Sequence, residues 1–341
     1  MSDPLHRLTP VVRVAPAKLN LTLAVLGRRP DGFHDLHSVM VPLGLADRLT
    51  LAPTGSVGRD ARDTLHVAGF DPGPPGDNLV LRAVAAARAA VGGGWAGGPG
   101  PAPALAARLD KRIPVSAGLA GGSSDGAAAL DGALEAWGAA LSHGDRVRLA
   151  AGIGSDVPFF LAGGPALVEG RGERVMPLDG LRGTPGVLLV TPALAISTAE
   201  AFAAFAGFGG RGDGSVRLTS DHLAGELRGG LAVADLVARA GVLAAANDLL
   251  PAAGTIAPGL VPFRRALFRL LQRPVGLSGS GPTLWALYPS EHDAAAAAAV
   301  IREAVADGTL VAPGDGAPNI VATTIVSGPS GPPPADERTD P

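Results

Sequence analysis

The chain contains no cysteine at all. This absence excludes disulfide bridges, thiolate zinc sites, iron–sulfur clusters and cysteine nucleophiles. Aromatic residues are also scarce, at 4% of the sequence against 47% for all hydrophobic residues. The core must therefore be built mainly from small side chains, which favours closely packed helices and tight turns.

An excess of positive charge is missing as well. The formal net charge is −3, from 28 Lys and Arg against 31 Asp and Glu, and like charges do not gather in runs. We therefore expect no nucleic-acid partner. No hydrophobic signal core follows the first charged residues, and the alanine run at 294–299 is too short to cross a bilayer. These absences predict a cytoplasmic protein with no membrane association.

Strand and helix patterns are mixed along the chain. In the first half, alternating apolar residues predict strands at 12–25, 39–51, 64–67, 104–113 and 165–177. The helices predicted there are 79–91, 123–140 and 145–151. The second half continues with strands at 187–191, 283–288 and 319–326 and helices at 199–205, 262–272 and 291–306. This order predicts an α+β chain in two lobes, 1–176 and 177–328, followed by a disordered tail at 329–341.

Two local details belong to this prediction. Pro16 should break the first strand, because proline has no N–H for a sheet ladder. Asp77 and Asn78 stand directly before an apolar helical pattern and are candidate caps.

The segment Gly118–Ser124 is rich in glycine and serine and precedes a helix. Glycines allow the backbone to approach a ligand closely, and the N-terminus of a helix favours phosphate oxygens. The serine hydroxyls could cap the helix, bind phosphate or reach Mg²⁺. The sequence has no G-x-x-x-x-G-K-[ST] motif, so the loop is not a P-loop. A tight turn with an N-cap remains the structural alternative.

The same segment also fits a serine-hydrolase pattern. Gly122-Ser123-Ser124-Asp125-Gly126 matches G-x-S-x-G, a motif that needs a buried strand directly before the turn. The preceding residues, 117–121, are a loop instead. The candidate bases His143, His222 and His292 stand in uninformative contexts, so a hydrolase is disfavoured.

Three further signals involve single charges or glycines. Lys18 enters an alternating strand and is either a cation on a rigid element or a solvated edge lysine. Asp156, among glycine, proline and apolar residues, is either a helix N-cap or, paired with a lysine, a general base. The glycine turn 277–283 should be structural, with its backbone close to the first glycine loop.

Together and in this order, these segments resemble the GHMP kinase superfamily. Gly27–Leu36 is similar to the substrate motif of one branch, the 4-diphosphocytidyl-2-C-methyl-D-erythritol kinases, and 156–160, 169–173 and 247–249 match that branch too. The resemblance implies a two-lobed fold, with a ribosomal-protein-S5-domain-2-like N-terminal lobe and a ferredoxin-like C-terminal lobe. It implies transfer of the γ-phosphoryl group of ATP, in the non-mevalonate isoprenoid pathway, to a cytidine diphosphate-linked methylerythritol.

The resemblance also implies residue roles. Asp156 would be the general base and Lys18 would keep it ionised, which requires the two side chains to lie within hydrogen-bond reach. The implied ATP contacts are Asn78, Lys111, Pro114, Gly118, Leu119, Ala120, Gly121, Gly122, Ser123 and Ser124. The implied acceptor contacts are Asn20, Phe33, His34, Thr198 and Phe202, with Phe33 stacking on the cytosine where the family usually has tyrosine and His34 bonding the pyrimidine edge.

Two departures and three alternatives accompany the resemblance. Ala120 stands where many members have glycine, and Asp125 where many have asparagine or a small residue; we expect Asp125 to face the solvent, away from the phosphates. ATP chemistry requires Mg²⁺, although the sequence does not identify its ligands. A monomer or weak homodimer is expected.

The alternatives to this function are the hydrolase, a kinase for homoserine or mevalonate-type acceptors, and a silent nucleotide-binding sensor. The presence of Lys18 and Asp156 disfavours the sensor.

Overall fold

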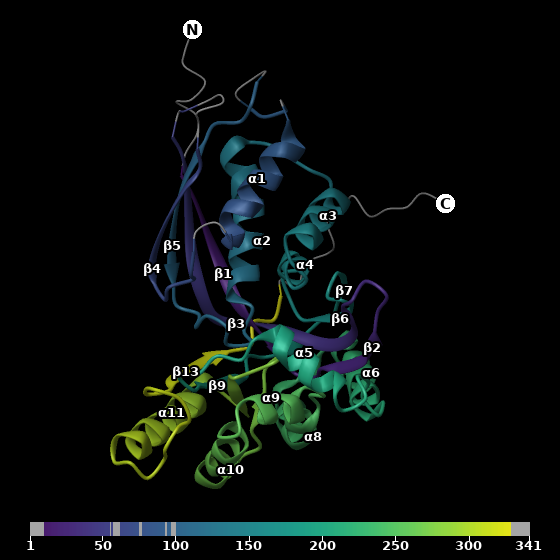
Figure 1. Cartoon of the computed structure of the whole chain (residues 1–341), viewed down its shortest axis with the longest axis vertical. Helices are drawn as coiled ribbons and strands as arrows, with labels where there is room; N and C mark the ends of the chain where they lie inside the picture. Colours follow the sequence, from purple (N-terminus) through teal and green to yellow (C-terminus); the bar gives the residue numbers. More distant parts are fainter. Residues whose placement is uncertain are drawn as a thin grey trace.

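The computed structural model describes residues 10–54, 56, 62–74, 77–92, 94–96 and 100–328. In this part of the chain the strands form a seven-stranded sheet, a four-stranded sheet and a two-stranded pair. The seven-stranded sheet and its helices form the upper half of the molecule in Figure 1, and the four-stranded sheet lies below. The predicted tail at 329–341 lies outside the described residues.

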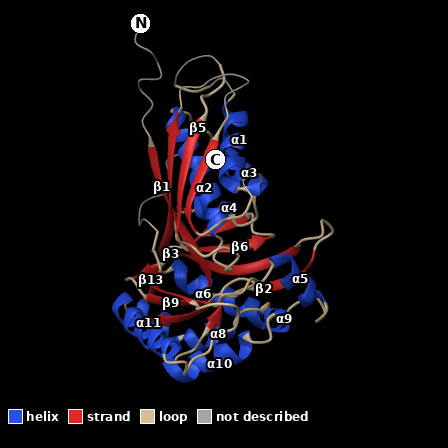
Figure 2. Ribbon diagram, turned by 60° about the vertical axis from the view of Figure 1, so that its left-hand side comes forward, coloured by secondary structure: helices blue, strands red, loops and turns tan. Residues whose placement is uncertain are grey.

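The large sheet is organised around one long strand, β3 (His34–Pro53). The other strands of this sheet are β1 (Val11–Asn20), β2 (Ala24–Arg28), β4 (Thr64–Gly69), β5 (Leu105–Lys111), β6 (Ala166–Gly170) and β7 (Arg174–Pro177). β3 pairs antiparallel with β1, β2, β5 and β6, and β4 runs parallel to β5. One face of this sheet is covered by the helices α1 (Leu79–Val91), α2 (Gly121–Trp137), α3 (His143–Ile153) and α4 (Val157–Leu161) (Figures 1 and 2).

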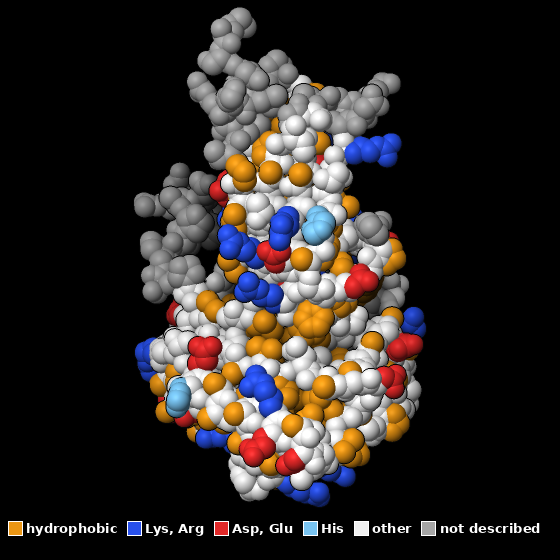
Figure 3. Space-filling view, turned by 90° about the vertical axis from the view of Figure 1, so that its left-hand side faces the viewer, with side chains coloured by type: hydrophobic (Ala, Val, Ile, Leu, Met, Phe, Trp, Pro, Cys, Tyr) orange, Lys and Arg blue, Asp and Glu red, His pale blue; other side chains and the backbone are white. Residues whose placement is uncertain are grey.

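Along the first half of β1, the other face of the large sheet is open to solvent. Val12 and Val14 of β1 are 47% and 69% exposed there, whereas Leu19, further along β1, and Leu21, just after its end, are buried. Charged residues of both signs and hydrophobic residues are interspersed on the face seen in Figure 3. The alternation predicted for this strand is therefore present, but Val12 and Val14 face water and not the core.

Pro16 does not break β1, contrary to the prediction. The strand continues, and its register against β3 shifts instead: Pro16 pairs with Ala46, and Lys18 pairs with Pro42. A proline is tolerated where the ladder is irregular, because its missing N–H leaves no bond unmade there. Downstream of this irregularity, Lys18 and Asn20 lie in the buried half of the strand.

The starts of two helices can be compared with their predicted caps. The Asn78 side chain accepts the N–H of Val80 at the start of α1, so this cap is confirmed, whereas Asp77 is not the cap. Helix α2 begins at Gly121 and not at Ser123, and its N-cap Ala120 provides no side-chain hydrogen bond. Of the roles considered for the serines, capping of this helix is therefore not the one they have.

The second sheet carries the C-terminal half. Its strands are β9 (Gly186–Thr191), β11 (Gly276–Leu277), β12 (Leu284–Tyr288) and β13 (Asn319–Thr324), and the two-stranded pair is β8 (Leu181–Arg182) with β10 (Leu231–Ala232). The helices are α5 (Thr198–Ala206), α6 (Ser215–Arg228), α7 (Val233–Ala238), α8 (Ala240–Ala245), α9 (Leu250–Ile256), α10 (Leu260–Leu271) and α11 (Glu291–Ala306). The antiparallel order β11-β12-β9-β13, with helices between β9 and β11 and between β12 and β13, is the ferredoxin-like arrangement. The predicted fold class is confirmed.

A buried apolar cluster lies between the two sheets and belongs to both. It joins Leu19 and Val41 of the large sheet to Leu189 and Trp285 of the small one. A second cluster, which includes Trp137, fills the space between the large sheet and its helices. β7 ends at Pro177, next to the lobe boundary predicted at 176/177, which remains a prediction.

None of the helices within the described ranges is long and apolar enough to cross a membrane.

Candidate active site

A cavity of about 1160 Å³ lies where the two halves of the chain meet. The end of β1, the N-termini of α2 and α4, the β2–β3 connection, and α5 all contribute to its wall. Fifteen residues predicted from the sequence line it: Lys18, Asn20, Phe33, His34, Asn78, Lys111, Pro114, Gly118, Ala120, Gly121, Gly122, Ser123, Asp156, Thr198 and Phe202. Leu119 and Ser124 do not; both are buried.

The N-terminus of α2 opens into this cavity. The Ser124 N–H donates to the Ala120 carbonyl at 3.0 Å and begins the helical ladder, so the N–H groups of residues 121–123 precede that ladder. Apart from its chain neighbours and the backbone of its own helix, no heavy atom of the described residues lies within 4 Å of the position a Gly122 Cβ would take. The arrangement therefore offers backbone N–H groups and the positive end of a helix dipole to an anion.

The two glycine turns touch each other through their backbones, as predicted. Gly118 has a φ of +76°, and a Cβ there would lie 2.2 Å from the Ser278 carbonyl oxygen. The Ser278 hydroxyl also donates to the Gly118 carbonyl at 2.9 Å. Only glycine fits this contact, and the phosphate-facing loop is thereby fixed to the C-terminal half.

Lys18 is a buried cation beside the α2 loop. Its side chain is 4% exposed, and its Nζ donates to Asn20 Oδ1 at 2.5 Å. Asn20 in turn donates to Ser38 Oγ at 2.8 Å. Burial lowers the pKa of Lys18, and the charge of Asp156 opposes that shift. The alternative of a solvated edge lysine is excluded by this burial.

Asp156 faces Lys18 from the start of α4. Its Oδ2 lies 4.0 Å from Lys18 Nζ, and 30% of its side chain is exposed. It occupies the N-cap position of α4 but makes no side-chain cap hydrogen bond, so helix capping does not explain the presence of a carboxylate at this position. The separation is that of an ion pair and exceeds a hydrogen bond, so the predicted hydrogen bond is not present. Catalytic contacts of this kind commonly shorten only when substrate is bound.

Asp125 does not face the solvent, and that prediction is wrong. Its carboxylate is buried and accepts a hydrogen bond from Lys111 Nζ at 2.7 Å, while Lys111 also donates to Asp47 at 2.5 Å. The sequence argument considered only the helix dipole and missed Lys111, fourteen residues earlier at the end of β5. Two of the three Lys111 donors are thus used within the protein, and its assignment to adenosine remains a prediction.

Asp125→Asn is expected to flatten the pH dependence of stability. Burial raises the pKa of Asp125 to about 7, against the opposing charge of Lys111 and with help from Asp47. The folded state therefore holds a proton that the unfolded chain has released above its carboxyl pKa of 3.8. The unfolding free energy thus falls as pH rises through this window, by up to about 1.4 kcal/mol per pH unit. Urea unfolding at pH 5 and pH 8 measures the effect.

In that experiment the unfolding free energy of Asp125→Asn should increase relative to that of the wild type as pH rises, because asparagine carries no charge to bury. Asp179→Asn, which changes an exposed carboxylate between β7 and β8, is the matched control and should follow the wild type. Parallel curves for Asp125→Asn and the wild type would show that Asp125 does not titrate in this range.

His34 and Phe202 form the aromatic end of the cavity. Their rings stack with centroids 4.7 Å apart and an interplanar angle of 19°. Burial lowers the pKa of His34, with a further contribution from Arg28, so the imidazole is neutral near pH 7. Its Nε2 is buried without a hydrogen-bond partner among the described residues. A neutral imidazole offers one donor and one acceptor, which suits the edge of a heterocyclic base.

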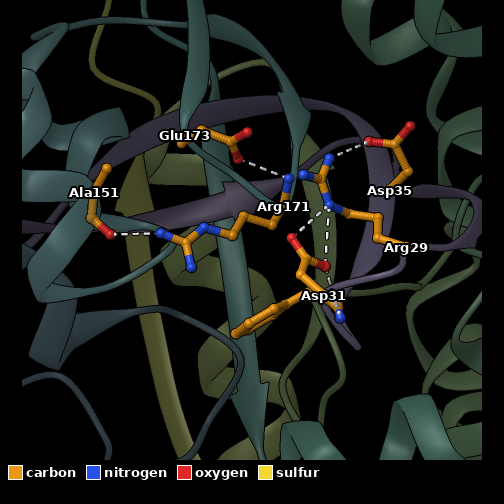
Figure 4. A network of polar contacts seen from close by, with 7 residues as sticks. Arg29, Asp31, Asp35, Ala151, Arg171 and Glu173 are labelled. Carbon is orange, nitrogen blue, oxygen red and sulfur yellow. Dashed lines mark hydrogen bonds and ion pairs between the residues drawn. The ribbon is translucent and has the colours of Figure 1, made fainter.

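Phe33 lines the cavity beside Arg171, whose own contacts are drawn in Figure 4. The guanidinium carbon of Arg171 lies 5.2 Å from the Phe33 ring centroid, within cation–π range. Arg171 also donates to the Ala151 carbonyl at 2.9 Å, and its backbone N–H donates to Glu173 at 2.8 Å. The turn between β6 and β7 thus connects the end of α3 to the ring that was predicted to stack on a base.

A second arginine in the same view fixes the loop that carries Phe33. Arg29 pairs with Asp31 at 3.1 Å and with Asp35 at 3.4 Å. Asp31 Oδ1 in addition accepts the Phe33 N–H at 3.2 Å. These exposed ion pairs contribute little stability individually, but they define the path of the loop.

Known proteins share both the sequence and this arrangement. Residues 78–164 match the family model described as GHMP kinases N terminal domain. The 4-diphosphocytidyl-2-C-methyl-D-erythritol kinase of Pelotomaculum thermopropionicum is 38% identical over 86% of this chain and 94% of its own length. The enzymes of the same name from Methylorubrum extorquens and Deinococcus radiodurans are 40% and 39% identical over 85% and 87% of this chain. The chain belongs to the 4-diphosphocytidyl-2-C-methyl-D-erythritol kinase family.

Solved structures agree with this membership. A crystal structure of 4-(cytidine 5'-diphospho)-2C-methyl-D-erythritol kinase superposes with a TM-score of 0.66 at 30% identity, covering 93% of this chain and all of the other. The mevalonate kinase of Methanococcus jannaschii superposes with a TM-score of 0.64 at 14% identity, which shows the shared fold. Like its family, the chain is a small-molecule kinase.

Membership in a kinase family removes the hydrolase alternative, and the geometry does so independently. Ser124 lies inside the first turn of α2, and its hydroxyl is buried without a hydrogen-bond partner among the described residues. It does not line the cavity and cannot act as an exposed nucleophile.

Sequence reasoning missed several residues of the cavity wall. Arg28, Arg171, Gly279 and Ser280 line it without having been assigned a role. Arg28 and Arg171 stand inside segments already recognised as family motifs, so attention to their charge could have found them. The contribution of Gly279 and Ser280 depends on how the two lobes dock, which no local pattern reveals.

Proposed function

We propose that the chain transfers the γ-phosphoryl group of ATP to the 2-hydroxyl of 4-diphosphocytidyl-2-C-methyl-D-erythritol. The products are ADP and the 2-phosphate, at a step of the non-mevalonate isoprenoid pathway. One observation carries the proposal: a single cavity joins the N-terminus of α2, the Lys18–Asp156 pair and the stacked His34–Phe202 rings. These suit a triphosphate, a reacting hydroxyl and a pyrimidine base, respectively.

In this reaction the acceptor oxygen forms a bond to the γ-phosphorus as the bond to the β–γ bridging oxygen breaks. The carboxylate of Asp156 takes the hydroxyl proton, and ADP leaves with the bridging oxygen. The Lys18 ammonium stabilises charge on the transferring group, and the N–H groups of residues 121–123 hold the phosphates. Most of the acceleration comes from positioning and electrostatics, because phosphoryl transfer needs little covalent help from the protein.

At the acceptor end, His34 bonds the edge of the cytosine and Phe33 stacks on its face. Phe202 already packs against His34 and so fixes the plane of the imidazole. Asn20 and Thr198 face the same cavity as Asp156 and contact the methylerythritol portion. Asn78 and Lys111 are assigned to the adenosine end.

Mg²⁺ would accompany the ATP. The described residues contain no cluster of three or more His, Asp or Glu side chains that could hold a metal alone. Mg²⁺ is usually bound by substrate phosphates with one or two protein oxygens, and the Ser123 hydroxyl is the candidate on the cavity wall. When bound, the ion neutralises phosphate charge. We assign a monomer or a weak homodimer acting in the cytoplasm.

The test is coupled ADP release with ATP, Mg²⁺ and the cytidyl acceptor, compared with homoserine, mevalonate and no acceptor. Turnover with the cytidyl acceptor alone is expected. Acceptor-dependent turnover only with homoserine or mevalonate, or with none of the three, from protein shown to be folded, would overturn the proposed substrate.

A further inference from the structure

The motif Asn247-Asp248-Leu249 lies behind the glycine turn and has no role in the steps above. Asn247 is 6% exposed, and its Nδ2 donates to the carbonyls of Leu277 and Gly279, both at 2.9 Å. Its Oδ1 accepts the Leu249 N–H at 2.9 Å. One buried amide therefore uses both its donors and its acceptor on backbone groups.

The turn that Asn247 holds lies against the Lys18 ammonium, the phosphate-facing loop and Thr198. A Cβ on Gly279 would lie 3.3 Å from Lys18 Nζ and 3.2 Å from the Gly118 carbonyl oxygen. Ser280 Oγ lies 3.2 Å from Thr198 Oγ1, on the acceptor side. The position of this turn thus limits where the Lys18 ammonium and the phosphate-facing loop can lie.

The same motif is fastened to the strand that continues from Lys18. The Leu23 N–H donates to the Ala246 carbonyl at 2.8 Å, and the Asp248 N–H donates to the Leu23 carbonyl at 2.9 Å. Asp248 Oδ2 accepts the Val25 N–H at 2.8 Å. Asn247 consequently bridges two elements that must keep a fixed separation, the β1–β2 segment and the Gly279 turn.

We propose that Asn247 is a positioning residue for phosphoryl transfer, which fixes the Gly279 turn against Lys18 and Gly118. This inference rests on the proposed function. Asn247 touches no reacting atom and acts through the turn. A displacement of the turn by a fraction of an ångström changes the distance from the Lys18 ammonium to the transferring group, and rates depend steeply on that geometry.

Two variants separate positioning from folding. Asn247→Leu removes both donors at similar size, and Asn247→Asp replaces the amide nitrogen by an oxygen that repels two carbonyls. For Asn247→Leu, kcat should fall roughly 10- to 100-fold at all pH values, with KM for ATP and acceptor within about threefold. For Asn247→Asp, kcat relative to wild type should rise several-fold from pH 8 to pH 6, because the protonated acid regains one donor. Asn319→Asp, on an exposed asparagine at the start of β13, is the matched control.

Hydrogen–deuterium exchange of residues 276–283 gives a readout that does not depend on turnover. Both Asn247 variants should exchange faster than wild type in this segment, and Asn319→Asp should not. A kcat for Asn247→Leu within twofold of wild type, or a rise confined to KM, overturns the inference while the proposed function stands. If the wild type shows no turnover with the cytidyl acceptor, the proposed function fails. The inference about Asn247 is then tested by exchange alone, and unchanged exchange of residues 276–283 in both Asn247 variants overturns it.

Discussion

Asp156→Ala is expected to lower kcat by about 10²- to 10⁴-fold, the range for loss of a general base, with the fold intact. The tertiary hydroxyl of the acceptor is a poor nucleophile until its proton is removed. Asp156 is placed to remove it, since its carboxylate lies on the cavity wall and 4.0 Å from Lys18. KM for ATP should change little, because the triphosphate is held mainly at the N-terminus of α2. Steady-state ADP release measures both constants.

The fold should survive because Asp156 makes no cap hydrogen bond at the start of α4. Asp156→Asn keeps the size and should be as inactive as the alanine variant. Asp179→Asn, the exposed control between β7 and β8, should retain wild-type turnover. Near-normal kcat in either Asp156 variant would remove it from the mechanism.

Lys18→Met should lower kcat by roughly 10²- to 10³-fold, as for loss of one preorganised donor, and should also weaken nucleotide binding. Methionine matches the length of the lysine stem but leaves no charge beside the phosphates. The variant should unfold no more easily than wild type, because burial of the ammonium is itself unfavourable and lowers the pKa of Lys18. A melting curve and calorimetry with ATP test these two statements separately.

The lowered Lys18 pKa adds a pH signature to the same variant. Phosphate binding favours the ammonium form, so the wild type must take up a proton when it binds ATP above that pKa. Its affinity for ATP should therefore fall as pH rises through the pKa, and Lys18→Met should lose this part of the dependence. Lys18→Arg should not restore activity, since Gly279 leaves little room for a planar guanidinium beside Nζ. Full activity of the arginine variant would contradict that fit.

Much of the fold could be predicted because local patterns and tertiary packing agree. The helix at 79–91 has an asparagine cap and an apolar face, and it forms over these residues. The first strand was harder to predict, because Pro16 argues against a continuous hydrogen-bonded strand pair unless the partner strand is irregular at that point. That irregularity belongs to β3, whose register shift opposite Ala17 has no signature within 12–25.

The site shows the same division. Gly118 and Ser123 are recognisable because backbone approach and helix termini have local sequence signals. The orientation of Asp125 could not be recognised from the sequence. Its counterion Lys111 stands at the end of another element and reaches Asp125 only when β5 lies beside α2. The stacking of His34 on Phe202 likewise joins residues far apart in the sequence. Long-range pairs of this kind decide charge and orientation, and a single sequence does not display them.

The apolar cluster shared by the two sheets restricts how the enzyme can move. Leu19 of β1 and Trp285 of β12 are both fully buried in it, so pulling the halves apart would expose a continuous hydrophobic surface to water. Swinging motions of whole lobes about a hinge, common where the contact between lobes is small, are therefore costly here. Entry of nucleotide and exit of product must instead depend on rearrangements at the rim, such as the loop that carries Phe33.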